Sequence, residues 1–310
     1  MLGLGLTLLS LPPARADDWP QWRGPGRDGV WRETGIIEAF ATAELKPRWT
    51  ASIGPGYSGP TVAGDRVFLT DRVTTPEPQE RVLCFDRVTG RPLWTHAYPC
   101  VYRDLDYAIG PRAAVTVADG RAFSLGAMGH AHGFEVTDGR VLWARDLASE
   151  LKASVSVWGV TAAPLVAGDL VIFQIGGQPD ACLVALDAKT GQERWRALDG
   201  KASYSAPRLI RQGNRVVMLA WTGRWLACLE PATGSVLWKV PYKPTKMILN
   251  VADPVLDEAG RKVFLSAFYD GSVLYALKPD LGTPDLLWKR AGPSERKTDG
   301  LHSIIMTPFI

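Results

Sequence analysis

Five windows of the chain alternate short apolar segments with a turn of Gly, Asp or Asn. In each window an apolar segment leads into the turn, and a second segment rich in β-branched and aromatic residues follows it. Two short apolar runs joined by such a turn predict a β-hairpin. The five windows are SGPTVAGDRVFLT (58–70), AAVTVADGRAFSL (113–125), AAPLVAGDLVIFQ (162–174), SAPRLIRQGNRVVML (205–219) and ADPVLDEAGRKVFL (252–265).

A second predicted hairpin follows each window and ends on a tryptophan. An acid lies eight residues before the tryptophan in all five copies, and a Gly lies four residues before it in four of them. The fifth copy, LKPDLGTPDLLW, moves its Gly to Gly282. An acid in this place accepts hydrogen bonds from the N–H groups of the turn, and Gly supplies positive φ. The matching residues are Asp86, Gly90 and Trp94; Glu135, Gly139 and Trp143; Asp187, Gly191 and Trp195; Glu230, Gly234 and Trp238; and Asp280 with Trp288.

The spacing of the tryptophans predicts a repeat of supersecondary units. Successive tryptophans are 49, 52, 43 and 50 residues apart, and each unit holds about four short strands. Helical repeats would need apolar stripes of period 3.6, which these windows lack. Four-stranded units of this length close radially into a β-propeller. We therefore predict an all-β propeller of four-stranded antiparallel blades, with about five complete blades and the start of a sixth at SIIMTPFI (303–310).

The spacing small–x–acid–x–x–Thr–Gly–x–x–x–Trp resembles the tryptophan-docking motif of quinoprotein-type propellers, the PQQ-like repeat. The segments DWPQWRGPGRDGVWRETGI (18–36) and LKPRWTASIG (45–54) are similar to the lead-in of secreted bacterial PQQ-like repeat proteins. The resemblance covers residues 18–310 and implies the fold more specifically than the function. The small position is occupied by Cys84, Gly133, Ala185 and Cys228.

The resemblance also implies that this chain is a C-terminally truncated fragment. Related propellers have eight blades, and an early strand such as the one around Trp49 completes the last blade in them. We expect a lead-in over residues 17–46 and an incomplete propeller over residues 47–310, whose parent has two to three more units.

Residues 1–16 have the pattern of a secretory signal peptide. An apolar run from Leu2 to Leu11 precedes an A-x-A cleavage site that ends at Ala16. No Cys follows the cleavage site, so no lipoprotein anchor is expected. No later segment has about 18 uninterrupted apolar residues, so no membrane span is expected. We predict an exported protein, periplasmic or extracellular.

Composition and charge give no sign of a polyanionic partner. The 310 residues are 46% hydrophobic and 22% charged, and the net charge is +3 with no basic run. These values are typical of a soluble globular protein. They give no reason to expect nucleic acid or an anionic membrane surface as a partner.

The cysteines and two histidines favour structural roles. Cys84, Cys182 and Cys228 lie on predicted third strands of different units, and Cys100 follows a Pro in a loop, so we expect buried free thiols. His130 and His132 lie two residues apart without a third ligand nearby, so we predict a polar hairpin tip and no metal site.

Loops that enter the innermost strand of each unit carry the candidate ligand-binding residues. In a propeller these loops open on one face beside the central channel, where polar and aromatic residues converge. The alternative is that they satisfy loop backbone groups and fill the mouth of the channel. In the lead-in, Trp19, Trp22 and Arg23 favour a structural clamp over a partner contact. The candidates are Tyr57, Ser58, Arg112, Trp158, Tyr204, Ser205, Asn250 and His302.

The sequence contains no zinc pattern, P-loop or G-x-S-x-G motif, and no catalytic residue is assigned. We therefore predict a non-catalytic binding or scaffold module without a cofactor, whose ligand is a protein, peptide or glycan. The first alternative is a PQQ-dependent dehydrogenase of alcohols or sugars, for which the resemblance implies PQQ with Ca²⁺ in the channel and Arg112 as the one channel cation. The adjacent Cys-Cys pair of many such enzymes is missing. The second alternative is a scaffold for outer-membrane protein assembly.

Overall fold

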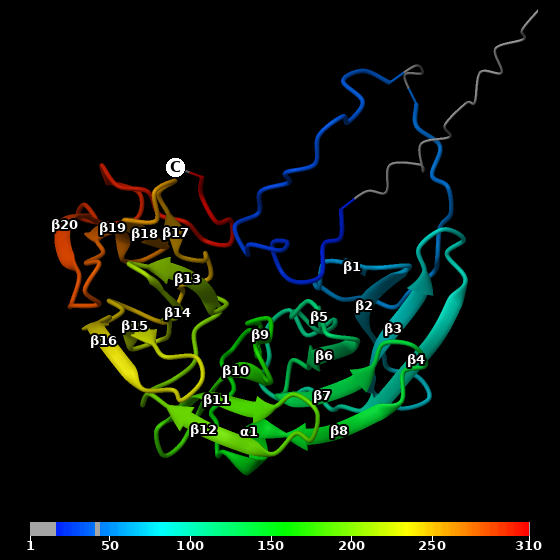
Figure 1. Ribbon diagram of the computed structural model, residues 1–310. Helices are drawn as coiled ribbons and strands as arrows, with labels where there is room; N and C mark the ends of the chain where they lie inside the picture. Colours follow the sequence, from blue (N-terminus) through cyan, green and yellow to red (C-terminus); the bar gives the residue numbers. More distant parts are fainter. Residues whose placement is uncertain (1–16, 41–43, 310) are drawn as a thin grey trace, which may run out of the picture.

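The computed structural model describes residues 17–40 and 44–309 and contains five four-stranded antiparallel sheets, here called blades 1 to 5 (Figure 1). Blade 1 consists of β1 (Thr61–Ala63), β2 (Arg66–Val73), β3 (Gln79–Asp86) and β4 (Pro92–Pro99), and blade 2 of β5 (Thr116–Ala118), β6 (Arg121–Leu125), β7 (His130–Glu135) and β8 (Val141–Asp146). Blade 3 consists of β9 (Leu165–Ala167), β10 (Leu170–Gly177), β11 (Ala181–Asp187) and β12 (Glu193–Ala197). Blade 4 consists of β13 (Arg208–Gln212), β14 (Arg215–Trp221), β15 (Trp225–Leu229) and β16 (Val236–Pro241), and blade 5 of β17 (Val255–Leu256), β18 (Lys262–Ala267), β19 (Gly271–Ala276) and β20 (Asp285–Arg290).

The blades follow one another along an arc in chain order. The first strand of each blade lies on the inner side of the arc and the fourth on the outer side (Figure 1). The helix α1 (Leu147–Glu150) lies between blades 2 and 3 in the chain. These sheets confirm the prediction of an all-β chain built from four-stranded antiparallel units. The expected first strand of a sixth unit is not formed within residues 291–309, and a ring of eight blades remains a prediction.

Each blade has two different ends. Its strands are antiparallel neighbours in chain order, so the hairpins β1–β2 and β3–β4 lie at one end, which we call the turn end. The hairpin β2–β3 and the connection to the next blade lie at the other, which we call the loop end. Residues 1–16, and the predicted signal peptide with them, lie outside the described residues. In the described part of the chain no helix is long and apolar enough to cross a bilayer.

At the turn end, the aspartate copies of the repeated motif cap their turns as predicted. Asp86 Oδ1 accepts hydrogen bonds from the N–H groups of Val88 and Thr89 at 3.1 and 2.8 Å and from the Thr89 hydroxyl at 2.8 Å. These donors, the Thr89 hydroxyl first, hold the pKa of the Asp86 carboxyl below its usual value. Gly90 has φ of 71°, in the left-handed region. Blade 3 repeats the cap with Asp187, Lys189, Thr190 and Gly191.

The glutamate copies form ion pairs in place of this cap. The Glu135 carboxylate lies 3.4 Å from the Arg140 guanidinium, and Glu230 pairs with Arg215 on the neighbouring strand. A Glu side chain has one methylene more than Asp, so its carboxylate extends past the turn N–H groups to a surface arginine. The expectation of one cap in every copy is therefore wrong for these two residues.

Each tryptophan of blades 1 to 3 docks onto the turn of the following blade. The Trp94 indole N–H donates to the carbonyl oxygen of Val136 at 3.1 Å. A Cβ added to Gly139 would lie 2.5 Å from Trp94 Cδ2, so only glycine leaves room for the ring. The same two contacts recur for Trp49 with Arg87 and Gly90, Trp143 with Ala188 and Gly191, and Trp195 with Pro231 and Gly234.

The small residue of the motif lies directly opposite its own tryptophan. Gly133 on β7 pairs with Trp143 on β8, and a Cβ on Gly133 would lie 2.5 Å from Trp143 Cε2. A register shift follows this pair in every blade, between Gly133 and Phe134 in blade 2. The bulge turns the indole toward the next blade. Equivalent pairs are Cys84 with Trp94, Ala185 with Trp195 and Cys228 with Trp238.

Blade 5 departs from this pattern. Trp238 of blade 4 donates its indole N–H to Gln212 of its own blade at 3.2 Å, because the fifth copy has no Gly at the docking position. Trp288 pairs with Leu274, a large residue, and is 37% exposed. The displaced Gly282 thus coincides with the loss of the docking contact.

The four cysteines are free and buried, as predicted. Burial raises the pKa of the Cys84 thiol to about 12, which leaves it unreactive at neutral pH. The histidine prediction was wrong for His132, which is not at a polar hairpin tip. It lies inside β7, 4% exposed, with its ring 5.1 Å from that of His96 on β4, so it is part of the contact between blades 1 and 2.

The lead-in runs along the inner strands. Trp19 forms an antiparallel bridge with Val62 on β1 through hydrogen bonds of 2.8 and 3.0 Å. The N–H of Val117 on β5 donates to the carbonyl oxygen of Pro20 at 2.8 Å. The lead-in therefore adds backbone pairing to the inner edges of blades 1 and 2.

The same segment also reaches the opposite end of the arc (Figure 1). The Trp22 indole N–H donates to Asp253 Oδ2 at 2.7 Å, and the Arg23 guanidinium lies 3.7 Å from the same oxygen. Asp253 precedes β17 of blade 5. These contacts confirm the predicted structural clamp.

Arg27 is the buried centre of the lead-in, and the sequence reasoning missed it. Its guanidinium donates to the carbonyl oxygens of Ala163, Pro164 and Pro207, with the Ala163 and Pro207 bonds at 3.2 and 2.8 Å. Burial lowers the pKa of Arg27 to about 10, so the group stays charged at neutral pH. One side chain thus joins the inner edges of blades 3 and 4.

Candidate functional site

At the loop end, successive connections bring aromatic and cationic side chains together. Arg112 comes from the β4–β5 connection, Trp158 from the segment between α1 and β9, and Tyr204 from the β12–β13 connection. We call the set of Tyr57, Tyr102, Tyr107, Arg112, Trp158 and Tyr204 the loop-end cluster.

Arg112 is held in place by its own loop. Its guanidinium donates to the carbonyl oxygens of Asp106 and Tyr107 at 3.0 and 2.8 Å, and also to that of Gly110. The guanidinium carbon lies 5.3 Å from the centre of the Tyr57 ring, within cation–π range. Arg112 is therefore the anchor of the cluster, with its cation turned toward an aromatic ring.

Three rings continue the cluster from blade to blade. The ring centres of Tyr107 and Trp158 are 6.0 Å apart, and those of Trp158 and Tyr204 are 5.2 Å apart. The Trp158 backbone N–H donates to the Tyr204 hydroxyl at 3.3 Å. Tyr107 is 68% exposed and Tyr204 only 5%, so the series runs from the surface into the interior. Arg112 and Tyr204 therefore lie on the same face.

A buried carboxylate supports the cluster from below. Glu80 on β3 accepts hydrogen bonds from the Tyr98 and Tyr102 hydroxyls and, at 3.0 Å, from the backbone N–H of Ala127. Burial and then the Glu80 charge raise the pKa of Tyr102, so its hydroxyl remains a donor. The Arg72 guanidinium lies 4.0 Å from the centre of the Tyr102 ring. These contacts fix the Tyr102 ring before any ligand arrives.

Four of the predicted site residues form side-chain hydrogen bonds inside the fold, although the buried Oδ1 of Asn250 has no partner among the described residues. This fits the alternative stated for them, that they satisfy loop groups, and their role in binding stays a prediction. Tyr102 and Tyr107 were missed as candidates, although Tyr107 begins the loop YAIGPR in which Arg112 was chosen. The four residues are Ser58 with Thr70, Ser205 with Asp253, Asn250 with the carbonyl oxygens of Trp221 and Thr222, and His302 with those of Phe268 and Ala291.

Comparison with known proteins identifies the family. Residues 78–303 match the family model described as outer membrane protein assembly factor BamB. The chain belongs to this family. The PQQ-like repeat inferred from the tryptophan motif is confirmed by this match.

Curated relatives of the chain include two different kinds of protein. The outer membrane protein assembly factor BamB of Burkholderia pseudomallei is 26% identical over 242 residues, which are 76% of this chain and 55% of that protein. Methanol dehydrogenase [cytochrome c] subunit 1 of Paracoccus denitrificans is 27% identical over 225 residues, 63% of this chain and 34% of that protein. The chain thus spans about half or less of the length of these relatives.

Among solved structures, the quinohemoprotein alcohol dehydrogenase from Comamonas testosteroni superposes with a TM-score of 0.63. The match covers 93% of this chain and 52% of the dehydrogenase chain at 16% identity. At this identity the likeness shows the fold alone.

Proposed function

We propose that this protein is a non-catalytic binding module that holds a protein partner through the loop-end cluster. The observation that carries the proposal is the series of rings from Tyr107, which is 68% exposed, through Trp158 to the buried Tyr204, with the 46% exposed Tyr57 beside Arg112. Exposed aromatic residues around an ordered arginine are typical of protein-binding surfaces.

The cluster is rigid before it binds, which favours affinity. Arg112 is fixed by loop carbonyl groups and Tyr102 by Glu80. A ligand therefore has fewer side chains to order, and each immobilised side chain would cost about 0.5–1.5 kcal/mol. Likeness to an assembly factor supports a protein partner over a glycan, and it supports a role in outer-membrane assembly as the more specific form of this proposal.

The dehydrogenase alternative is supported by the relation to methanol dehydrogenase. No group of three His, Cys, Asp or Glu side chains among the described residues is close enough to hold a metal ion. Arg112 directs three of its five N–H groups to loop carbonyl oxygens, which leaves fewer donors for a quinone carboxylate.

Capture of partners from the envelope extract of a bacterium that makes this protein tests the proposal. We expect a protein to be retained by the unchanged chain and lost with the Tyr57→Ser, Tyr107→Ser double variant. Val88→Ser is the matched control, because Val88 is 51% exposed at the turn end. Equal capture by all three proteins would refute the proposal.

A titration with PQQ and Ca²⁺ separates the two candidate functions. We expect no change in the absorbance spectrum of the quinone and no dye-linked oxidation of methanol or 1-butanol. Stoichiometric uptake of PQQ together with turnover would favour the dehydrogenase.

A further inference from the structure

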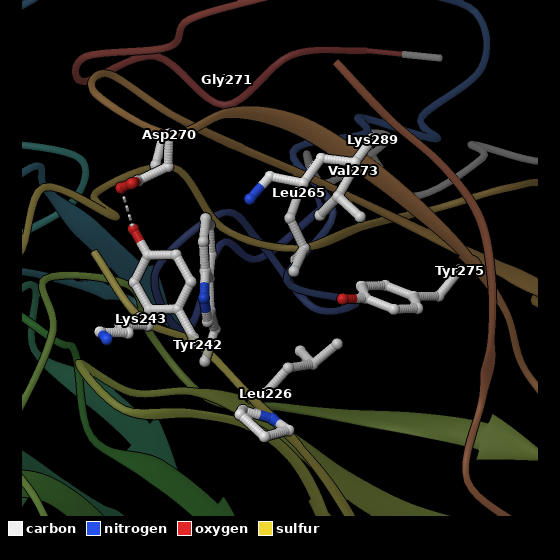
Figure 2. Close-up of a pocket in the computed structure, with 12 residues that line it drawn as sticks. Leu226, Tyr242, Lys243, Leu265, Asp270, Gly271, Val273, Tyr275 and Lys289 are labelled. Atoms are coloured by element: carbon white, nitrogen blue, oxygen red, sulfur yellow. Dashed lines mark hydrogen bonds between the residues drawn. The ribbon is translucent and has the colours of Figure 1, made fainter. Parts of the chain in front are cut away.

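A pocket of about 200 Å³ lies between blades 4 and 5, and none of its lining residues belongs to the loop-end cluster (Figure 2). Leu226 on β15 forms one wall, and Leu265 on β18 and Val273 on β19 form the other. The Trp221 indole closes the pocket next to Tyr242, with ring centres 5.2 Å apart. The walls are therefore largely apolar and come from two separate blades.

The polar groups that remain unpaired around this pocket are donors. The exposed side chain of Lys289 on β20 forms no ion pair or hydrogen bond within the described residues, and neither does the Tyr275 hydroxyl on β19. In Figure 2 the Tyr275 hydroxyl points toward the space between Leu226 and Leu265, and the Lys289 ammonium group lies beside Leu265, on the side that faces Asp270. The Trp221 indole N–H is buried and also has no partner.

The one carboxylate that lines the pocket, that of Asp270, already accepts a hydrogen bond on each oxygen. Asp270 Oδ2 accepts a hydrogen bond from the Tyr242 hydroxyl at 2.6 Å, and Oδ1 accepts one from the Thr245 backbone N–H at 2.8 Å (Figure 2). Asp270 is therefore held by the fold, and it forms no ion pair with Lys289. The pocket offers an ammonium group and a hydroxyl that no acceptor of the described residues pairs with.

We propose that this pocket binds a small apolar monocarboxylate, with the hydrocarbon part between the blades and the carboxylate on Lys289 and Tyr275. A cavity of ~150 Å³ in a protein core holds a benzene ring, so about 200 Å³ accommodates a ring with a short acid side chain. Ammonium and hydroxyl donors select a carboxylate over a neutral group of the same shape. Burial raises the pKa of Tyr275, so its hydroxyl is a donor at neutral pH.

A second lysine supplies a matched control. Lys243 also borders the pocket and has no ion pair within the described residues. In Figure 2 its ammonium group lies on the far side of the Tyr242 ring from Tyr275. Lys289 and Lys243 carry the same charge, and only Lys289 lies on the same side of the Tyr242 ring as Tyr275.

Ligand-observed NMR titration of the full chain with 3-phenylpropionate tests the proposal, with 3-phenylpropionamide as the uncharged isostere. We expect the acid to bind and the amide to bind at least tenfold more weakly. Lys289→Gln should weaken binding of the acid about tenfold, and Tyr275→Phe about threefold. Lys243→Gln should change it less than twofold, and the thermal midpoints of all three variants should stay close to that of the parent.

Several outcomes of the same titrations would overturn the proposal of a carboxylate site. Equal binding of acid and amide, an unchanged affinity in Lys289→Gln, or no binding of the acid at all would overturn the proposal. A peptide that ends in phenylalanine, compared with its C-terminal amide, distinguishes the other source of the same chemistry. Binding of that peptide without binding of 3-phenylpropionate would replace the small acid by a polypeptide C-terminus and would also overturn the proposal. None of these readouts depends on the loop-end cluster.

Discussion

The turn end and the loop end of the blades differ in how much of their chemistry repeats. At the turn end, an indole N–H donates to a carbonyl of the next blade and its ring covers a glycine, as Trp94 does with Gly139. At the loop end each connection has its own length and its own residues, such as Arg112 in one and Tyr204 in another. Contacts that recur between blades 1 to 4 hold those blades together, whereas residues that occur once are free to define a ligand.

The largest effect should come from removing a docked tryptophan. Trp195→Ala deletes a ring that is 8% exposed and its hydrogen bond to Pro231, so we expect a loss of about 3–5 kcal/mol in the free energy of unfolding. Trp288→Ala should cost only about 1 kcal/mol, because Trp288 is the undocked copy. Urea unfolding followed by circular dichroism measures both, and equal losses would contradict the docking role.

Substitution of Gly139, which lies under the Trp94 indole, tests tryptophan docking more specifically. Gly139 and Gly120 both have φ of 73°, but an added Cβ at Gly139 meets the Trp94 ring and one at Gly120 meets nothing within 4 Å. Gly120→Ala should cost about 1 kcal/mol of backbone strain. Gly139→Ala should cost about 1–3 kcal/mol more from overpacking. If the two variants unfold at the same urea concentration, the ring does not depend on the glycine.

The contact between blades 1 and 2 should contribute less to the free energy of unfolding at acidic pH. Burial, then the neighbouring His96 and His130, lower the pKa of His132 to about 3, while the unfolded chain titrates near 6.5. The unfolded state thus takes up a proton first, and stability falls as the pH drops from 6.5 toward 3. The loss due to His132 is about 2 kcal/mol at pH 5.

His132→Phe removes this contribution and serves as the comparison. The difference in unfolding free energy between pH 7 and pH 5 should be smaller in the variant by about 2 kcal/mol. An identical pH dependence of the two proteins would show that His132 is not held neutral in the fold.

The smallest effect on stability belongs to the loop end. Tyr107 is 68% exposed, so Tyr107→Ser should change the free energy of unfolding by less than about 0.5 kcal/mol. The same change should weaken partner binding at least tenfold if the ring is an anchor of the interface. Biolayer interferometry with the captured partner measures the second quantity. If Tyr107→Ser lowers the free energy of unfolding and leaves partner binding unchanged, Tyr107 stabilises the fold and the loop end is not the binding surface.

The difference between the ends also explains what the sequence could predict. The docking tryptophans and their glycines follow a fixed spacing, so the strands and the turn chemistry of Asp86 and Asp187 were predictable from the pattern alone. The ion pairs of Glu135 and Glu230 were not predictable from the pattern, because the added methylene of Glu places the carboxylate next to an arginine.

The candidate site was predictable only in outline. The loops that carry Arg112 and Tyr204 could be placed on one face from the order of the strands. The support of Tyr102 by Glu80 and the central position of Arg27 arise from contacts between segments far apart in the chain, and no local pattern marks them. A single long-range contact has no spacing by which a sequence could reveal it.

The loop end is assigned to partner binding, and the turn end only to holding the blades together. Site-specific photo-crosslinking tests this assignment most directly. A benzoylphenylalanine is placed at Tyr107 on the loop end or at Val88 on the turn end, both of them exposed. After irradiation in cells, we predict one discrete protein adduct from position 107 and none from position 88. An adduct from position 88 alone, or the same adduct from both positions, would contradict the account.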